Sequence, residues 1–287
     1  QDNIERVWES VNENPETSTR KRATQLPMSR TSLRRIMKKN LLLFPYKIEM
    51  VHEILPQDYA TRLRFCAKLT ELSTDDPDFM KKIIMTDEAH FHLSGYVNKQ
   101  NFRIWGTENP RVIQQRPLHP LRVTVWCGIS ADKIYGPYFF QDEDGSALTV
   151  NGERYRAMLE NFLFPELDNT QEMWFQQDGA TSHTARETMN LLRTVFGNRI
   201  VSRFGNVNWP SRSPDLTPPD FFLWGYLKDR VYANKPQGLQ QLKDNIINEI
   251  ITIDQPVLAS VMDQVQQRAA ACKEADGRHL KDIIFKI

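Results

Sequence analysis

The sequence predicts an α/β protein in which a mixed sheet flanked by helices follows a small all-α unit. A series of β-forming segments between residues 83 and 141 predicts one part of the sheet. The succession of strand, helix and strand from Met173 to Phe204 is typical of a parallel βαβ unit and predicts the other part. Short amphipathic helices near the start of the chain predict the all-α unit. We therefore expect an N-terminal domain over residues 1–42, a linker over 43–55 and a main domain over 56–287.

Composition limits the class of protein. The 287 residues include 37 basic and 36 acidic side chains, which excludes a uniformly basic nucleic-acid coat. Three cysteines far apart in the sequence (Cys66, Cys127 and Cys272) indicate neither a disulfide framework nor a zinc site, and favour a reducing, intracellular compartment. No apolar run approaches the roughly 20 residues that span a bilayer, so we expect a soluble protein without membrane contact. Because the chain begins with Gln1, we expect a fragment or a processed form.

The N-terminal domain is predicted to contain three short helices, over residues 2–12, 17–26 and 29–40. Asn14 and Pro15 end the first helix, and Pro27 makes a tight break before Ser29, a residue type that caps helices. Three short helices with a tight turn before the last one have the outline of a helix-turn-helix unit, in which the last helix lies against DNA.

Charge in this domain supports contact with DNA. Between Thr17 and Ile48 the chain has nine Lys or Arg residues and no Asp or Glu. We expect Leu33, Ile36 and Met37 to face a small core. A solvated basic helix is the alternative, but the absence of acids and the tight turn favour DNA. The residues predicted to contact DNA are Arg20, Lys21, Arg22, Arg30, Thr31, Arg34, Arg35 and Lys38.

In the main domain, hydrophobic periodicity predicts a helix from Pro56 to about Ser73. β-forming runs then predict a meander, and the segment from Thr107 to Pro120 is polar and predicts an exposed loop. The chain after Pro218 is predicted to be mostly helical. The expected strands are 83–93, 101–106, 121–130, 134–141, 173–177 and 200–204, and helices are expected over 150–167 and 182–196.

Asp178 follows the apolar run Met173–Gln177 and precedes a helix. The carboxyl end of a parallel strand delivers side chains into the crevice where ligands bind, and Gly179 allows a close approach. The alternative is that Asp178-Gly179 is only a turn dipeptide.

Asp87 lies within a β-rich segment, where a carboxylate is unfavourable unless it is exposed or functional. We expect Glu88 to point to the opposite face. An acid on the solvated face of an edge strand is the alternative for Asp87. His90 and His92 form an HxH pair, which we interpret as ordinary polar-face residues because no further zinc ligands are suitably spaced.

A third carboxylate comes from the segment Ser213–Asp220. Asp220 fits a helix start, with Thr217 as its cap and Pro218 in the first turn, where a negative charge is favourable. Asp215 is a second candidate in the same turn, and the chemistry alone does not decide between the two acids. His183, after Asp178, is a candidate for either the site or a local cap. Two or three such carboxylates suit Mg²⁺ or Mn²⁺, and a pair of these ions can catalyse phosphodiester chemistry.

Four ordered motifs resemble those of the Tc/mariner superfamily of transposases, which belong to the wider RNase H-like DDE/D group. MTDEAHFHLSG is similar to the first-acid motif of the family, FQQDGATSHTA to the second and WPSRSPDLTPPDFFLWGYLK to the third. VHEILPQD is similar to the linker motif of the mariner branch. Residues 179 to 219 separate the last two acids, and this interval of 41 residues is longer than the usual mariner interval.

The resemblance implies an RNase H-like catalytic domain with Asp87, Asp178 and Asp220 as the catalytic, metal-binding acids. It implies cut-and-paste DNA transposition: a water activated by Mg²⁺ or Mn²⁺, with two ions per site, hydrolyses a phosphodiester at the element's ends, and the freed 3′-hydroxyl then attacks target DNA, commonly at TA. It also implies a DNA-binding homodimer that holds two terminal inverted repeats in the nucleus, with residues 94–120 reaching the partner.

Two other hypotheses remain open at this point. One is a domesticated, catalytically silent DNA-binding descendant, and the other is a nuclease of the same fold that cuts without strand transfer. Three intact acids weigh against the first, and the N-terminal DNA-binding unit weighs against the second. Relatives usually carry two helix-turn-helix units before the catalytic domain, whereas one is visible in this sequence.

Overall fold

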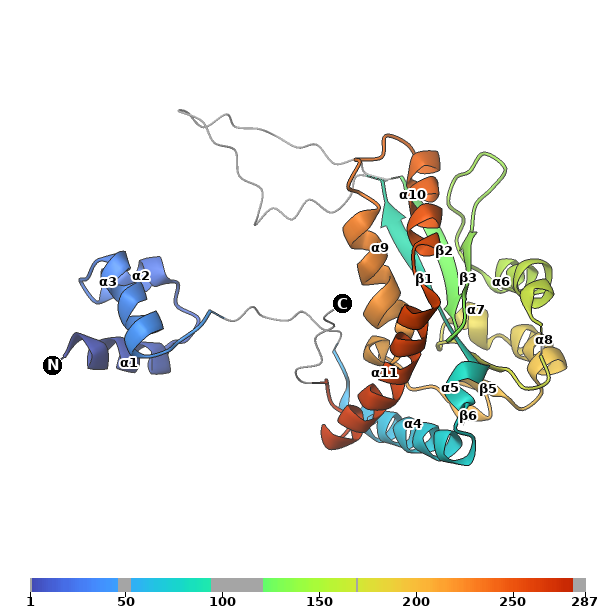
Figure 1. Ribbon diagram of the computed structural model, residues 1–287, viewed down its shortest axis with the longest axis horizontal. Helices are drawn as coiled ribbons and strands as arrows, with labels where there is room; N and C mark the ends of the chain where they lie inside the picture. The colour runs from blue at the N-terminus through green and yellow to red at the C-terminus, as the bar shows by residue number, and fades with distance from the viewer. Residues whose placement is uncertain (1, 46–52, 94–120, 169, 281–287) are drawn as a thin grey trace. The chain divides into compact units, whose positions relative to one another are not determined.

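A computed structural model describes residues 2–45, 53–93, 121–168 and 170–280 (Figure 1). The chain divides into two compact units, residues 1–52 and 53–287. This division falls within the predicted linker 43–55. The predicted strand 101–106 and the predicted partner-contacting loop 94–120 lie outside the described residues. None of the helices in the described ranges has the length and apolar character needed to span a bilayer.

The N-terminal unit consists of α1 (Asn3–Glu13), α2 (Thr19–Gln25) and α3 (Arg30–Arg35). A π-helical turn, η1 (Ile36–Asn40), extends α3. Side chains cap all three helices as expected from their types. Asp2 accepts from the amide of Ile4, Ser18 from that of Lys21 and Ser29 from that of Ser32. The helices enclose a small core formed by Val7, Ala23, Leu33 and Ile36. The predicted three-helix outline is therefore confirmed.

The second unit contains a six-stranded sheet in the order β3-β2-β1-β4-β5-β6. Three strands, β1 (Ile83–His92), β2 (Arg122–Ile129) and β3 (Ile134–Phe139), pair antiparallel. The other half is parallel, because β4 (Trp174–Gln176) pairs with β1 and with β5 (Ile200–Ser202). The edge strand β6 (Val207–Asn208), which the sequence did not predict, pairs parallel with β5. The predictions of a meander, of a parallel βαβ unit and of a mixed sheet are confirmed.

Helices cover both faces of this sheet, as Figure 1 shows. Alternation along the strands sends Ile83 and Met85 into one apolar cluster and Ile84 into the other. The first cluster includes side chains of α4 (Pro56–Asp75), α5 (Phe79–Lys82), α9 (Trp224–Arg230), α10 (Leu239–Ile251) and α11 (Gln255–Glu274). The second includes side chains of α6 (Gly152–Met158), η2 (Leu159–Leu163) and α8 (Arg186–Phe196), with η3 (Phe164–Glu166) after η2. The predicted helix 182–196 is divided at Ala185 into α7 (Thr181–Thr184) and α8.

The segment after β6 is anchored by a buried arginine of α4. Arg62, whose side chain is 0% exposed, donates from both Nη atoms to Asp215, at 2.8 and 2.6 Å. It also donates to Ser213 Oγ and to the carbonyl of Gly277. Asp215 lies in the short turn η4 (Pro214–Leu216), which leads into η5 (Pro219–Leu223) and α9. Arg62 thereby holds the segment that presents Asp220.

A second ion pair supports the same segment, because Arg212 donates to both oxygens of Asp58 at 2.6 and 2.7 Å. The hydrogen bond from Arg212 is the main reason why the pKa of Asp58 lies below its usual value. Asp58 also accepts from the amide of Leu55 and so begins α4. Both anchors therefore start in the helix that follows the linker.

We expect Arg62→Met to destabilise the protein by about 3–5 kcal/mol, because it leaves the partly buried Asp215 carboxylate without its partner. Urea unfolding measures this change. The matched control is Arg64→Met, two residues away on the exposed side of α4, which we expect to stay within about 0.5 kcal/mol of wild type. Equal stability of the two variants would contradict the anchoring role of Arg62.

For the second ion pair we expect a pH signature. Folding lowers the pKa of Asp58. The folding stability that its carboxylate contributes is therefore fully present above the unfolded pKa and is lost as pH falls through the folded pKa. Asp58→Asn should therefore be less stable than wild type at pH 7, and the difference should shrink below about pH 3.9. Unfolding at several pH values tests this, with Asp75→Asn on the exposed face of the same helix as control. A difference that does not change with pH would refute the assignment.

Candidate active site

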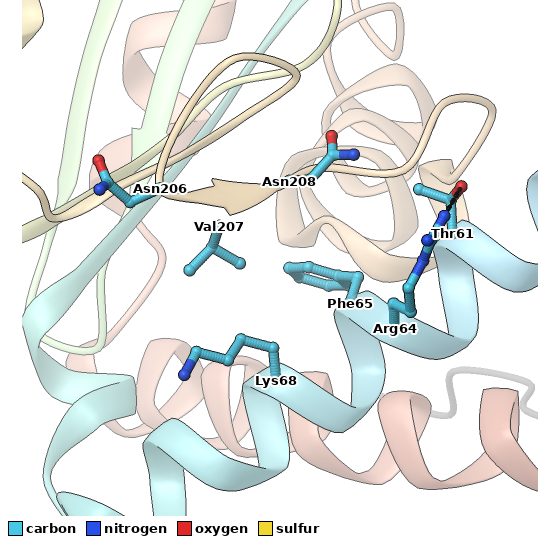
Figure 2. A pocket seen from close by; sticks show the side chains of 7 residues that line it. All are labelled: Thr61, Arg64, Phe65, Lys68, Asn206, Val207 and Asn208. Atoms are coloured by element: carbon cyan, nitrogen blue, oxygen red, sulfur yellow. Dashed lines mark hydrogen bonds between the residues drawn. The ribbon is translucent and has the colours of Figure 1, made fainter.

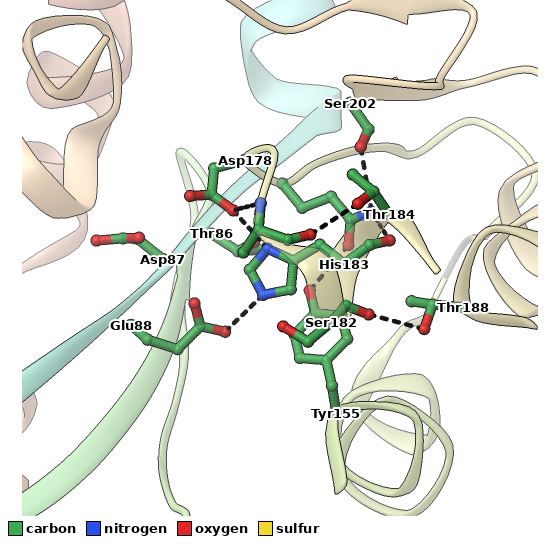
Figure 3. A network of polar contacts seen from close by, with 12 residues as sticks. Thr86, Asp87, Glu88, Tyr155, Asp178, Ser182, His183, Thr184, Thr188 and Ser202 are labelled. Carbon is green, nitrogen blue, oxygen red and sulfur yellow. Dashed lines mark hydrogen bonds and ion pairs between the residues drawn. The ribbon is translucent and has the colours of Figure 1, made fainter. Parts of the chain in front are cut away.

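Strand register places Asp87 and Asp178 at the same level of the sheet. Met85 pairs with Gln176 in the parallel ladder of β1 and β4. Asp87 and Asp178 each come two residues later, so both side chains belong to the same face as their paired predecessors. Figure 3 shows the two carboxylates close to each other. The position predicted for Asp178, at the carboxyl end of a parallel strand, is confirmed.

Asp87 is partly buried and its Oδ2 accepts from the indole Nε1 of Trp224 at 2.8 Å. Burial raises the pKa of Asp87 well above its usual value, and the carboxylate of Asp220 is the next largest cause. Glu88 and Asp178 add smaller contributions of the same sign. Such a rise is expected where several carboxylates share one region with little water. Asp87 is thus part of an acidic cluster and not an acid on a solvated edge strand.

Asp178 is held by the turn that it begins. Its Oδ1 accepts from Nδ1 of His183 at 2.6 Å and from the amide of Ala180 at 2.9 Å. Burial raises the pKa of Asp178, but the hydrogen bond and the charge of His183 outweigh it, so that the pKa lies below its usual value. Asp178 therefore remains ionised while Asp87 is the carboxyl that protonates more readily.

His183 connects Asp178 to Glu88. The imidazole is 2% exposed, and its Nε2 lies 3.1 Å from Oε1 of Glu88 (Figure 3). Although burial lowers the pKa of His183, the two carboxylates raise it to about 10. The imidazole also lies against the ring of Tyr155, with 4.2 Å between centroids. Glu88 lies on the face opposite to Asp87, as predicted, and its carboxylate is the second one that contacts His183.

Two glutamines of the FQQDGA motif fix this turn. The side chain of Gln176 accepts from the amide of Thr86 at 3.1 Å, which fixes the end of β4 against β1. Gln177, fully buried, donates to the carbonyl of His183 at 2.9 Å and accepts from the hydroxyl of Tyr155 at 3.0 Å. Sequence reasoning missed both roles, although two polar residues at the end of an apolar strand signal hydrogen bonds that must be satisfied.

The two candidate acids of the third segment, Asp215 and Asp220, have different contacts in the structure. Asp215 forms the ion pair with Arg62 and belongs to the anchor of the segment. Asp220 is exposed in η5, accepts from Thr217 Oγ1 at 2.7 Å and influences the pKa of Asp87. Trp224, four residues after Asp220, reaches Asp87, so this helical segment faces β1. Of the two acids, Asp220 is therefore the one associated with the cluster. Thr217 supports its carboxylate rather than capping through its side chain.

The carboxylates are close without forming a complete metal cage. Within the described ranges, no group of three or more His, Cys, Asp or Glu side chains is arranged to hold a metal ion. The donors nevertheless fit a hard divalent cation, because they are all carboxylate oxygens, and burial and the neighbouring negative charges raise the pKa of Asp87. Mg²⁺ commonly takes one or two carboxylates and completes its shell with substrate phosphate and water. His90 of the HxH pair has its Nδ1 3.1 Å from Oγ1 of Thr124, which lies on the neighbouring strand β2.

In the N-terminal unit, seven of the eight predicted DNA-contacting residues have exposed side chains. These are Arg20, Lys21, Arg30, Thr31, Arg34, Arg35 and Lys38. The prediction for Arg22 is wrong, because its side chain is buried and donates to Ser10 Oγ and to the carbonyl of Asn14. Arg22 satisfies polar groups near the end of α1 instead of facing outward.

The chain is similar in sequence to nematode transposases, although no family model matches it. It is 25% identical over 248 residues to the Tc3 transposase of Caenorhabditis elegans, which covers 85% of this chain and 69% of that protein. It is also 25% identical over 135 residues to the Tcb2 transposase of Caenorhabditis briggsae, which covers 43% of this chain and 46% of that protein.

Solved structures of Mos1 transposase share the fold. The paired-end complex with the left transposon end has a TM-score of 0.75 at 18% identity, covering 98% of this chain and 80% of that chain. The Mos1 catalytic domain has a TM-score of 0.61 at 17% identity and covers 81% of this chain and all of that domain. Mos1 paired-end complexes have been solved with Mn and with Mg. The predicted RNase H-like α/β fold is thereby confirmed.

The three acidic motifs and the 25% sequence identity to Tc3 transposase thus relate the chain to transposases of the Tc1/mariner superfamily, and the Mos1 structures share its fold.

Proposed function

We propose that the chain is a DNA transposase that cuts the ends of its element and joins the freed 3′-hydroxyl ends to target DNA by cut-and-paste chemistry. The observation that carries this proposal is the acidic cluster. Asp87 and Asp178 each follow the paired residues Met85 and Gln176 of two parallel strands by two positions, and burial and the charge of Asp220 raise the pKa of Asp87. The relationship to Tc3 transposase and the fold of the Mos1 strand-transfer complex support it.

In this proposal Asp87, Asp178 and Asp220 hold Mg²⁺ or Mn²⁺, with two ions per site. Two bound ions would supply Lewis-acid stabilisation of the attacking and leaving oxygens of a phosphodiester. The chain itself supplies oriented carboxylates. Asp178 uses Oδ1 for His183 and Ala180, and Asp87 uses Oδ2 for Trp224. Within the described part of the chain, the second oxygen of each carboxylate remains available to a cation.

The donors behind the carboxylates have a positioning role. His183 cannot move without breaking contacts on both ring nitrogens, and its carbonyl is held by Gln177. Trp224 donates to Asp87 on the face of the sheet opposite to the one where His183 lies. The carboxylates are therefore oriented before substrate arrives, which lowers the cost of assembling the site.

The helix-turn-helix unit is proposed to bind the terminal inverted repeats through α3 and the exposed cations around it. Pairing of two ends by a homodimer is part of the proposal, supported by the paired-end complexes of Mos1. Chromosomal DNA as the substrate would place the protein in the nucleus, with TA as the proposed target site. All three acids are present, which favours an active enzyme over a silent DNA-binding descendant.

We expect Asp87→Asn, Asp178→Asn and Asp220→Asn each to lower Mg²⁺- or Mn²⁺-dependent cleavage of the element's end DNA by about a thousandfold, because each removes several kcal/mol of metal-mediated stabilisation. Single-turnover cleavage and strand-transfer assays measure this, and removal of the metal with a chelator should abolish both steps.

Asp229→Asn is the matched control, since Asp229 is an exposed carboxylate on α9, the helix that carries Trp224. It should cleave like wild type. The catalytic assignment fails if Asp178→Asn or Asp220→Asn cleaves as fast as this control. Cleavage without any strand transfer by the wild-type chain would instead favour a nuclease.

For the N-terminal unit, we expect Arg34→Ala combined with Arg35→Ala to weaken binding of the inverted repeat. The slope of log affinity against log salt should become shallower by about one unit for each lost phosphate contact. Lys81→Ala combined with Lys82→Ala, which removes the same charge from α5, is the control. Equal affinity and equal slope for the two double variants would exclude the predicted DNA-binding face.

A further inference from the structure

Arg203 lies beside the turn that carries Asp178. Gln176 pairs with Val201 in the parallel ladder of β4 and β5, so Arg203 and Asp178 are both two residues beyond that pair. A Cβ placed on Gly179 would lie 3.6 Å from Cδ and 3.8 Å from Cβ of Arg203. The stem of Arg203 thus packs against the peptide that follows Asp178. Asp178 and Arg203 thus lie in neighbouring turns, directly after the adjacent parallel strands β4 and β5.

The guanidinium of Arg203 differs from the anchoring arginines. Arg62 and Arg212 each pair with a carboxylate, whereas Arg203 is exposed and forms no ion pair with a described carboxylate. It lies instead 5.4 Å from the ring centroid of Phe204, a large apolar side chain that is 56% exposed. An exposed cation next to an exposed aromatic ring is the combination that binds nucleic-acid strands, through phosphate and through base stacking.

The turn that carries these two residues is fixed in place. Gly205 has no space for a side chain, because a Cβ there would lie 2.4 Å from the carbonyl oxygen of Ile200. Arg193 of α8 donates to the carbonyl of Phe204 at 3.3 Å and brings a second guanidinium to the turn. The amide of Trp209 donates to the carbonyl of Ser202 at 3.1 Å and closes the loop between β5 and β6. Arg203 and Phe204 are therefore presented by a tight, hydrogen-bonded turn.

A hollow with polar side chains at its rim lies next to this turn, along β6. A cavity of about 320 Å³ lies between α4 and β6, and Figure 2 shows the cations of α4 on one side of it and two asparagines on the other. Its lining includes Arg64, Lys68, Asn206 and Asn208. Lys68 pairs with Glu71, whereas Arg64 donates to Thr61 Oγ1 and forms no ion pair with a described carboxylate. Side chains of these types are common phosphate contacts.

The hollow and Arg203 lie within reach of one DNA strand. Asn206 is three residues from Arg203, so their Cα atoms are at most about 11 Å apart. Successive phosphates of one strand advance about 3.4 Å along the axis of a duplex, so side chains this close can contact neighbouring phosphates of the same strand. A single strand passing the carboxylates could therefore contact both.

We propose that Arg203, Phe204, Arg193, Asn206 and Arg64 form a DNA-backbone contact surface, the turn surface, which holds the substrate strand against the carboxylate cluster. This proposal rests on the proposed function and adds a binding element of the catalytic unit to it. The turn surface lies mainly within the 41-residue interval between Asp178 and Asp220.

Photo-crosslinking tests the placement directly. Phe204→Cys and Ile251→Cys in the full chain each receive a thiol-linked crosslinker, and Cys66, Cys127 and Cys272 are buried. Ile251 is the control because it is 74% exposed on α10. With labelled duplex carrying the element's end, we expect crosslinks from position 204 near the cleaved phosphodiester and few from position 251. Equal yields, or no crosslinks from position 204, would overturn the proposal.

Substitution of Arg203 tests the energetic role. We expect Arg203→Ala to raise the half-saturating DNA concentration for cleavage about tenfold, as for one lost charge-assisted contact, and Arg203→Lys to restore most of it. Lys81→Ala serves as the charge-matched control, and melting temperatures check the fold. Unchanged half-saturation for Arg203→Ala would reject the turn surface. The crosslinks form without cleavage, so they separate this outcome from a failure of the catalytic assignment.

Discussion

Parallel pairing of β4 with its neighbours is the constraint on which the rest of the structure depends. The pairs Met85 with Gln176 and Gln176 with Val201 set the level of β1 relative to the carboxyl ends of β4 and β5. Because side chains in neighbouring parallel strands keep the same level and face, this register brings Asp178 beside Asp87 and Arg203 beside Asp178. A shift of one residue in β4 would send Asp178 to the opposite face and remove the cluster. The short β4 strand therefore determines the chemistry that the site can perform.

The register creates an electrostatic cost that nearby groups reduce. Carboxylates that approach one another while partly buried repel, and burial together with this repulsion raises the pKa of Asp87. His183 offsets part of the charge from beneath the turn, between Asp178 and Glu88. Trp224 gives Asp87 a hydrogen bond without adding charge. A site of this kind gains stability from a bound cation, which links the energetics of the fold to the proposed metal-dependent reaction.

The third acid depends on a different kind of contact. Arg62 and Arg212 fix the segment before Asp220 through buried or half-buried ion pairs to Asp215 and Asp58. Both pairs connect this segment to α4, which begins directly after the linker region. Asp220 reaches the cluster because its segment is anchored on one side by arginine and directed toward β1 on the other side by Trp224.

Much of the fold follows from local patterns. Runs of β-forming residues predicted β1, β2 and β3, since this signal depends on neighbours in the sequence. An apolar stripe predicted α1, and capping residues or Pro at the helix starts helped to predict α2, α3 and α4. Contacts between distant residues were not predictable in this way. Glu88 meets His183 across 95 positions and Arg62 meets Asp215 across 153, so the choice between Asp215 and Asp220 could not be made from chemistry alone. Arg22 was assigned to DNA because a charge run does not reveal which cation is buried, and β6 was missed because it has only two residues.

Direct metal binding tests the central claim, that acids from three separate segments form one divalent-cation site. Mn²⁺ titration of the full chain, followed by electron paramagnetic resonance of the unbound ion, measures this without any reaction. We predict that wild type and Asp229→Asn bind Mn²⁺ with the same affinity, that Asp87→Asn and Asp178→Asn lose most of this binding, and that end DNA tightens binding by wild type. Equal Mn²⁺ affinity of Asp87→Asn, Asp178→Asn and wild type would contradict the account.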